Sequence, residues 1–168
     1  MAKNVDVNTG EVVVSSENLI LRSIAIGSCI VIAAYDPRKK IAGMAHIMLA
    51  GRAPENGLER TKYAEDAIEE MIAEMTRQGC DLNDIEACLV GAGNVLEKDD
   101  DTICEENIRS VTNVLSEMNI PVRASVVGGT KRKGVYLDVA TGEVLYTEAD
   151  SSQMPLWQPE HVISGDNI

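Results

Sequence analysis

The sequence predicts an α+β fold, in which two helices cover one face of a mainly antiparallel sheet system. Short apolar runs separated by turn residues gather before residue 50 and after residue 120. Two segments between them carry apolar residues at helical spacing. Because strands and helices do not alternate regularly, the order favours a sandwich over a repeated βαβ arrangement. We expect roughly eight strands and two helices.

The N-terminal part of the sheet system is expected to come from closely spaced apolar runs. Residues 1–10 are polar and are expected to be frayed. Strands are expected at 12–14, 19–21, 23–26, 29–35 and 41–49. The segment 36–40 is a turn by its Asp-Pro-Arg-Lys-Lys composition, so the runs on either side should form a hairpin. The stretch 50–61, with two Gly, a Pro and an Asn, is expected to be a long loop of the kind that is often functional.

Two helices are expected, over residues 62–78 and 102–119, each with one apolar face. Gly79 is a plausible stop for the first helix, and Pro121 marks the exit from the second. Further strands are expected at 85–90, 122–127, 134–139 and 143–146, the last two joined by a hairpin turn at 140–142. A single domain over 1–168 is expected, with a core of about 11–148 and an irregular tail at 149–168.

The composition of the chain argues against several classes of function. Hydrophobic residues make up 45% of the 168 residues, but aromatic residues only 3%, so the core must be aliphatic. The net charge of −12 argues against a nucleic-acid partner, which needs a basic surface. We expect a cytoplasmic protein without membrane insertion, because no apolar stretch is long enough to span a bilayer and the N-terminus lacks an apolar signal region. Without C-x-x-C pairs and with only two His, neither a metal nor a cofactor is expected.

Four cysteines are present, and Cys29 differs from the others. Cys104 lies on the apolar face of the second expected helix, Cys88 lies within a strand, and Cys80 is expected to be an incidental surface thiol. Cys29 follows Gly27-Ser28 at the junction of two apolar runs. Glycine permits a tight path there, and nearby backbone N–H groups can stabilise an oxyanion. Gly-Ser-Cys is a common string, however, so a structural cysteine stays an alternative on spacing alone.

His46 is the candidate base for Cys29. A polar residue inside the apolar run 41–49 is either a core histidine with a hydrogen-bond partner or a functional group. The hairpin at 36–40 would place Cys29 and His46 nearly opposite each other, so that the imidazole could take the thiol proton. A third group should orient the imidazole, and the hydroxyl of Ser23, six residues before Cys29, is a candidate.

These residues resemble the active-site signature of the CheD family, the chemoreceptor glutamine deamidases. The signature covers Leu21 to Ile30 and Ala45 to Leu49. Weaker similarities in the same order extend the resemblance over about residues 11–148; they lie at Lys62-Tyr63-Ala64, Gly91-Ala92-Gly93, Asn107, Gly128-Gly129 and Thr141-Gly142.

The resemblance implies a protein-glutamine deamidase that converts Gln side chains of methyl-accepting chemotaxis receptors to Glu through a cysteine thioester. It implies a Cys-His-Thr/Ser triad at Cys29, His46 and Ser23, and a fold like that of bacterial deamidating toxins, a three-layer α/β sandwich. It also implies a regulatory partner, the phosphatase CheC, in species that encode one. We expect Lys62, Tyr63 and Asn107 to contribute to the substrate or partner surface.

The sequence departs from the family pattern at several positions. Ser23 stands where many members have Thr, Cys104 at a small Gly-like position, Glu106 where Arg is expected, and Val126 where an acidic residue is common. These changes leave the triad intact and bear on receptor and partner contacts. Two alternatives therefore stay open: a non-catalytic module that binds a receptor or CheC, and a different thiol enzyme such as a peptidase or transglutaminase.

Overall fold

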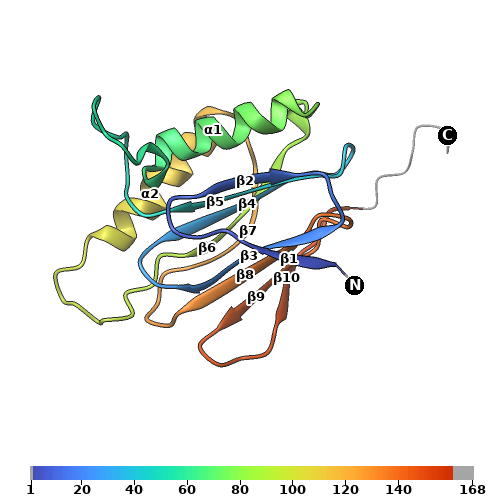
Figure 1. Ribbon diagram of the computed structural model, residues 1–168. Coiled ribbons are helices and arrows are strands. Elements are labelled where there is room, and N and C mark those ends of the chain that lie inside the picture. Colours follow the sequence, from blue (N-terminus) through green and yellow to red (C-terminus); the bar gives the residue numbers. More distant parts are fainter. Residues whose placement is uncertain (1, 161–168) are drawn as a thin grey trace.

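The computed structural model describes residues 2–160 and shows two stacked five-stranded sheets with two helices outside one of them (Figure 1). The first sheet has the order β1 (Lys3–Asp6), β3 (Leu19–Ile26), β8 (Lys133–Asp138), β9 (Val144–Glu148), β10 (Met154–Trp157). The second has the order β2 (Val12–Ser15), β5 (Ile41–Ile47), β4 (Ile30–Asp36), β6 (Glu86–Gly91), β7 (Val122–Val127). The helices are α1 (Ala64–Arg77) and α2 (Ile103–Glu117), preceded by short 3₁₀ turns at Arg60–Lys62 and Leu82–Asp84. The predicted α+β class, with both helices on one face, is confirmed.

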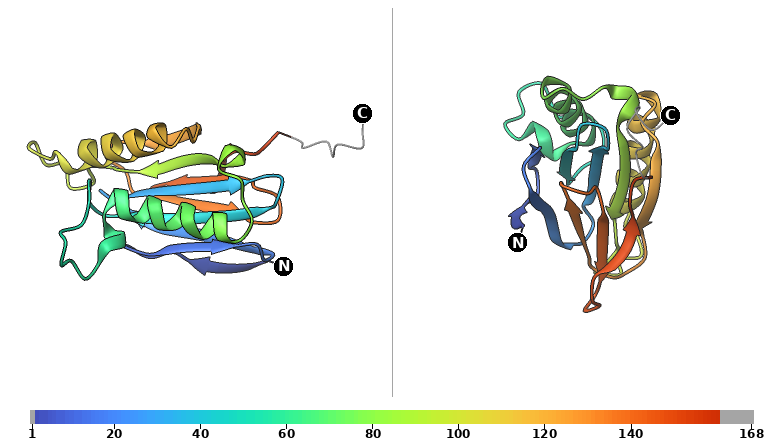
Figure 2. Two further views of the ribbon diagram at one scale, coloured as in Figure 1. Left: turned by 90° about the horizontal axis from the view of Figure 1, so that it is seen from above. Right: turned by 90° about the vertical axis from the view of Figure 1, so that its right-hand side faces the viewer.

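Strand β4 forms the centre of the sandwich, and all of its residues are buried. Its side chains alternate between two apolar layers. Ile30 and Ile32 pack with the helices, whereas Val31 and Ala33 pack toward the first sheet. Figure 2 shows both helices on the outer face of the second sheet. A strand buried on both faces reads as a continuous apolar run, which is why the sequence signal for this segment was strong.

Two segments expected to be irregular are strands instead, so the expectation of frayed residues 1–10 is wrong. Strand β1 pairs in parallel with β3, with Val5 opposite Leu21, and Val7 is 1% exposed. In the tail expected at 149–168, β10 pairs with β9, and Trp157 packs against the core; residues 161–168 lie outside the described range. Both strands are edge strands of the first sheet, where a short pairing involves only a few residues and leaves a weak sequence signal.

The predicted hairpin around residues 36–40 is confirmed. Strands β4 and β5 are antiparallel, and Val31 lies directly opposite His46. Cys29 comes two residues before Val31 and one before β4 begins. It is therefore a diagonal neighbour of His46 on the same face, rather than its direct partner.

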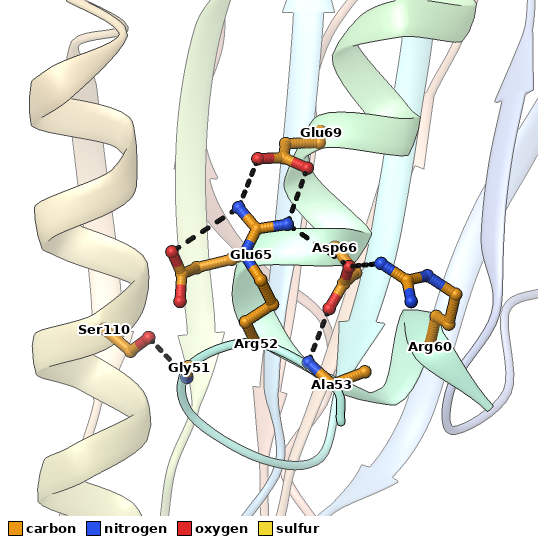
Figure 3. A network of polar contacts seen from close by, with 8 residues as sticks. All are labelled: Gly51, Arg52, Ala53, Arg60, Glu65, Asp66, Glu69 and Ser110. Atoms are coloured by element: carbon orange, nitrogen blue, oxygen red, sulfur yellow. Dashed lines mark hydrogen bonds and ion pairs between the residues drawn. The ribbon is translucent and has the colours of Figure 1, made fainter. Parts of the chain in front are cut away.

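The loop between β5 and α1 is fastened to α1 by ion pairs (Figure 3). Asp66, which is 6% exposed, accepts hydrogen bonds from the Ala53 amide at 2.7 Å and from Arg60 at 2.7 Å. Arg52 pairs with Glu69 at 2.6 Å, one turn further along the helix. The predicted long loop is thus present and braced at its base. Among residues 2–160, no helix is both long and apolar enough to cross a membrane.

Candidate active site

A pocket of about 320 Å³ opens at the end of the sandwich, where β3 leads into β4. Cys29, His46 and Ser23 all line it, so the structure brings the three predicted triad residues together. The turn that follows β1 forms the opposite wall, through residues 6–9. Because it is open to solvent and carries a thiol and an imidazole, the pocket can admit a side chain to both groups.

The Cys29 turn is held by the glycine-rich segment at the end of β6. The amide of Ala92 donates to the Cys29 carbonyl at 2.6 Å, and the amide of Gly93 donates to the Gly27 carbonyl at 2.9 Å. Gly91 has φ +126°, and a Cβ built on it would lie 2.4 Å from the Cys29 carbonyl oxygen. Glycine is required there by both conformation and space, which gives a structural reason for the Gly-Ala-Gly motif.

Asn107 anchors the same turn from the other side. Its Nδ2 donates to the Ser28 carbonyl at 3.0 Å and to the Met48 carbonyl at 3.1 Å. The residue is 0% exposed, so the expectation that it contributes to a substrate or partner surface is corrected. The physical reason is that two loop carbonyls need a buried donor pair, and a side-chain amide supplies both N–H groups. It is a positioning residue beneath the Cys29 turn.

Lys62 and Tyr63 lie at the start of α1, outside this pocket. Both are half-buried. They line a separate hollow of about 520 Å³ beside the 50–61 loop, together with Met48 and the 98% exposed Leu58. Their predicted role at a substrate or partner surface stays a prediction, but their position on an open hollow is compatible with it.

His46 is oriented by a backbone carbonyl. Its Nδ1 lies 3.0 Å from the Val7 carbonyl oxygen, which can only accept, so Nδ1 carries the proton and Nε2 is left as the basic nitrogen. The Ser23 hydroxyl donates to the same oxygen at 2.7 Å. No hydrogen bond joins Ser23 to His46 among the described residues, and the two side chains are linked only through the Val7 carbonyl oxygen that both contact.

Burial shifts the pKa values of His46 and Cys29 and thereby their protonation states. It lowers the pKa of His46, against an opposing effect of the hydrogen bond to Val7. Burial raises the pKa of Cys29, and a hydrogen bond from the Thr9 side chain opposes this. At neutral pH the resting site therefore holds a thiol and a neutral imidazole, a base ready to accept the thiol proton.

The other three thiols are inert by comparison. Cys80, Cys88 and Cys104 are buried, whereas Cys29 is only partly so. Burial raises the pKa of Cys80 and Cys88 to about 12 and that of Cys104 to about 11. The structural role predicted for Cys88 and Cys104 agrees with this, but Cys80, expected at the surface, is 5% exposed. Among the four cysteines, Cys29 is the one whose thiol is partly exposed.

Sequence reasoning missed Val7 and Thr9. Both belong to the N-terminal segment expected to be frayed. A backbone carbonyl carries no signature in a sequence, and Asn8-Thr9-Gly10 signals only a turn. Of the family departures, Cys104 donates to Asp101 at 3.3 Å, and Glu106 and Val126 take no part in the pocket around Cys29.

Comparison with known proteins identifies the family of this chain. The family described as CheD chemotactic sensory transduction matches residues 48–148. A probable chemoreceptor glutamine deamidase CheD of Chlorobium luteolum is 35% identical over 152 residues, covering 89% of this chain and 75% of the relative. One from Clostridium botulinum is 38% identical over 136 residues, covering 78% and 83%. The chemoreceptor glutamine deamidase CheD of Thermotoga maritima is 27% identical over 142 residues, covering 83% and 88%. The chain belongs to the CheD family.

Proposed function

We propose that this chain is a protein-glutamine deamidase that hydrolyses Gln side chains of chemoreceptors to Glu. One observation carries the proposal: the accessible thiol of Cys29 and the oriented, neutral imidazole of His46 share one face of adjacent strands in one open pocket. A thiol with an adjacent base is the pair of groups that acyl transfer through a thioester uses. The names of the relatives supply the substrate class, a receptor glutamine.

The first half of the reaction releases ammonia. Nε2 of His46 takes the Cys29 proton as the sulfur attacks the side-chain carbonyl carbon of Gln, and a C–S bond forms. The imidazolium then gives its proton to the amide nitrogen, the C–N bond breaks and ammonia leaves a thioester. In the second half His46 deprotonates a water molecule, which attacks the thioester. The C–S bond then breaks, the imidazolium returns its proton to the Cys29 sulfur, and the new carboxylic acid ionises to the Glu carboxylate.

The oxyanion of each tetrahedral intermediate needs hydrogen-bond donors that are already in place. Within the described part of the chain, the backbone amides of Ser28 and Cys29 have no hydrogen-bond acceptor. We assign the oxyanion contacts to these amides and to the turn at Gly27. The anchors of this turn, Gly91 and Asn107, would then fix the direction of the donors.

Cys29 and His46 are not hydrogen-bonded to each other in the free protein, as far as the described residues show. This does not oppose the mechanism, because catalytic hydrogen bonds commonly shorten only when substrate is bound. An entering Gln side chain would displace solvent between the two groups and strengthen their interaction.

The receptor would approach as a cytoplasmic helix, so we place the protein in the cytoplasm. The half-exposed Met48 and the fully exposed Leu58 flank the hollow beside Tyr63 and Lys62, and we propose that this hollow contacts the receptor. Regulation by a phosphatase of the CheC type is also a proposal. Ser23 keeps its proposed place in the triad, acting through the Val7 carbonyl.

Incubation with receptor cytoplasmic fragments, followed by mass spectrometry of their peptides, tests the function. We expect specific Gln residues to become Glu, and Cys29→Ala to abolish the conversion. Cys80→Ala is the matched control, because it removes a buried thiol that does not line the pocket. Tight receptor binding without conversion would identify a non-catalytic module, and peptide-bond cleavage would identify a peptidase.

A further inference from the structure

The turn between β1 and β2 is fastened at both ends to the strands that carry the site. At its start, the Val7 amide donates to the Arg22 carbonyl at 2.8 Å. At its end, the Gly10 amide donates to the His46 carbonyl at 2.8 Å, and the His46 amide donates to the Glu11 carbonyl at 3.1 Å. The intervening residues therefore cannot move far without disturbing the backbone of the proposed base.

The turn is also braced internally and from the side. The Asn8 amide donates to the Glu11 carboxylate at 2.7 Å, and the Glu11 amide donates to the Asn8 carbonyl at 2.8 Å. Gly10 has φ +84°, a conformation that glycine adopts without strain. The Thr61 hydroxyl, from the loop before α1, donates to the Gly10 carbonyl at 2.5 Å. This many constraints on four residues indicate a preorganised element and not a passive connection.

Thr9 is one of the residues that this turn contributes to the pocket, with Val7 and Asn8. Its side chain lines the pocket with Cys29 and His46. Thr9 itself is exposed, so its packing does not explain the bracing around it. Thr9 and Cys29 line the same pocket, and the Thr9 side chain lowers the pKa of the Cys29 thiol against the raising effect of burial.

We infer that Thr9 is a further residue of the catalytic site, whose hydroxyl donates a hydrogen bond to the Cys29 sulfur and stabilises the thiolate. The inference rests on the proposed role of Cys29 as the nucleophile. A hydrogen bond to an anion is roughly twice as strong as one to a neutral group, so Thr9 favours the sulfur after proton transfer over the sulfur before it. The braced turn keeps the donor in place during that transfer, without a cost in reorganisation.

Alkylation of the full-length protein by iodoacetamide tests the proposed contact between Thr9 and Cys29. The rate at neutral pH, followed at the Cys29 peptide by mass spectrometry, reports the thiolate population at that residue. We expect Thr9→Val, which keeps the shape but removes the hydroxyl, to slow alkylation about tenfold and to move its pH curve upward. Thr9→Ser should restore most of the rate, and Cys29→Ala gives the background from the three buried thiols.

Thr61→Val is the matched control, because it removes a hydroxyl that holds the same turn without touching Cys29. We expect it to alkylate within about twofold of the unmodified chain. Equal rates for Thr9→Val and the unmodified chain would overturn the inference. So would equal slowing in Thr9→Val and Thr61→Val, because the position of the turn would then be the cause.

The outcome is separable from that of the proposed function, because alkylation needs no receptor. A Thr9-dependent thiol together with absent Gln conversion would retain the Thr9–Cys29 contact and reject the deamidase. Conversion that is unaffected in Thr9→Val, with unchanged alkylation, would retain the deamidase and reject the role of Thr9. If both hold, Thr9→Val should lower kcat for receptor deamidation more than it changes KM, and Thr9→Ser should recover it.

Discussion

Replacing Gly91 with alanine tests the close approach that holds the Cys29 turn in position. Gly91 ends β6 with φ +126°, and an added Cβ would lie 2.4 Å from the Cys29 carbonyl oxygen and 2.8 Å from Cγ2 of Ile26. The first neighbour is backbone and the second is a core side chain that is 1% exposed. Neither can retreat cheaply, so the turn carrying Cys29 must shift.

Two effects lower the free energy of unfolding of the Gly91→Ala protein. An alanine at positive φ costs about 1–3 kcal/mol of folding free energy. Forcing a methyl group into a filled space costs a further 1–3 kcal/mol or so. The expected loss is therefore about 2–6 kcal/mol. Displacement of the nucleophile by about 1 Å should also lower receptor deamidation about a hundredfold.

Gly79→Ala is the control variant that carries the backbone cost without the steric cost. Gly79 follows α1 with φ +117°, but nothing lies within 4 Å of its added Cβ. It should lose only the backbone part, about 1–3 kcal/mol, and keep full activity. Urea denaturation gives both free energies of unfolding, and the deamidation assay gives the activities. A Gly91→Ala protein as stable and as active as Gly79→Ala would refute the proposed close approach.

Three further predictions follow from the site and its supports. Activity should fall as the pH drops through the pKa of His46, which burial places below 6.5, because the base becomes protonated. The unfolded chain takes up that proton at a higher pH than the folded one, so the free energy of unfolding should decrease over the same range. A pH–rate profile checks the activity, and melting curves at each pH check the stability. Asn107→Ala removes two buried donors and should cost about 2–3 kcal/mol in urea denaturation, with reduced alkylation of Cys29. Asp66→Asn should cost about 1–3 kcal/mol and expose the 50–61 loop to limited proteolysis. Glu69→Gln, at a half-exposed carboxylate, should change stability by less than about 1 kcal/mol; equal effects of the two variants would contradict the bracing by Asp66.

The sequence could predict the elements whose signal is periodic or compositional. The apolar faces of α1 and α2, the buried run of β4 and the hairpin at 36–40 all follow from local patterns. The candidate pair Cys29 and His46 follows from that hairpin and from the family resemblance. Short outer strands such as β1 and β10 give no comparable signal, because few of their side chains enter the core and their pairing partners lie far away in the chain.

By itself, the sequence determined the α+β class and the family, and it singled out Cys29 and His46 as the candidate nucleophile and base. Only the tertiary structure decided what surrounds them. The orienting group of His46 is the Val7 carbonyl, and every residue has a carbonyl. Asn107 lies beneath the Cys29 turn because α2 packs there, and Thr9 lines the pocket of Cys29 because β1 pairs with β3. Contacts between segments distant in the chain depend on how sheets and helices pack, which residue identity alone does not encode.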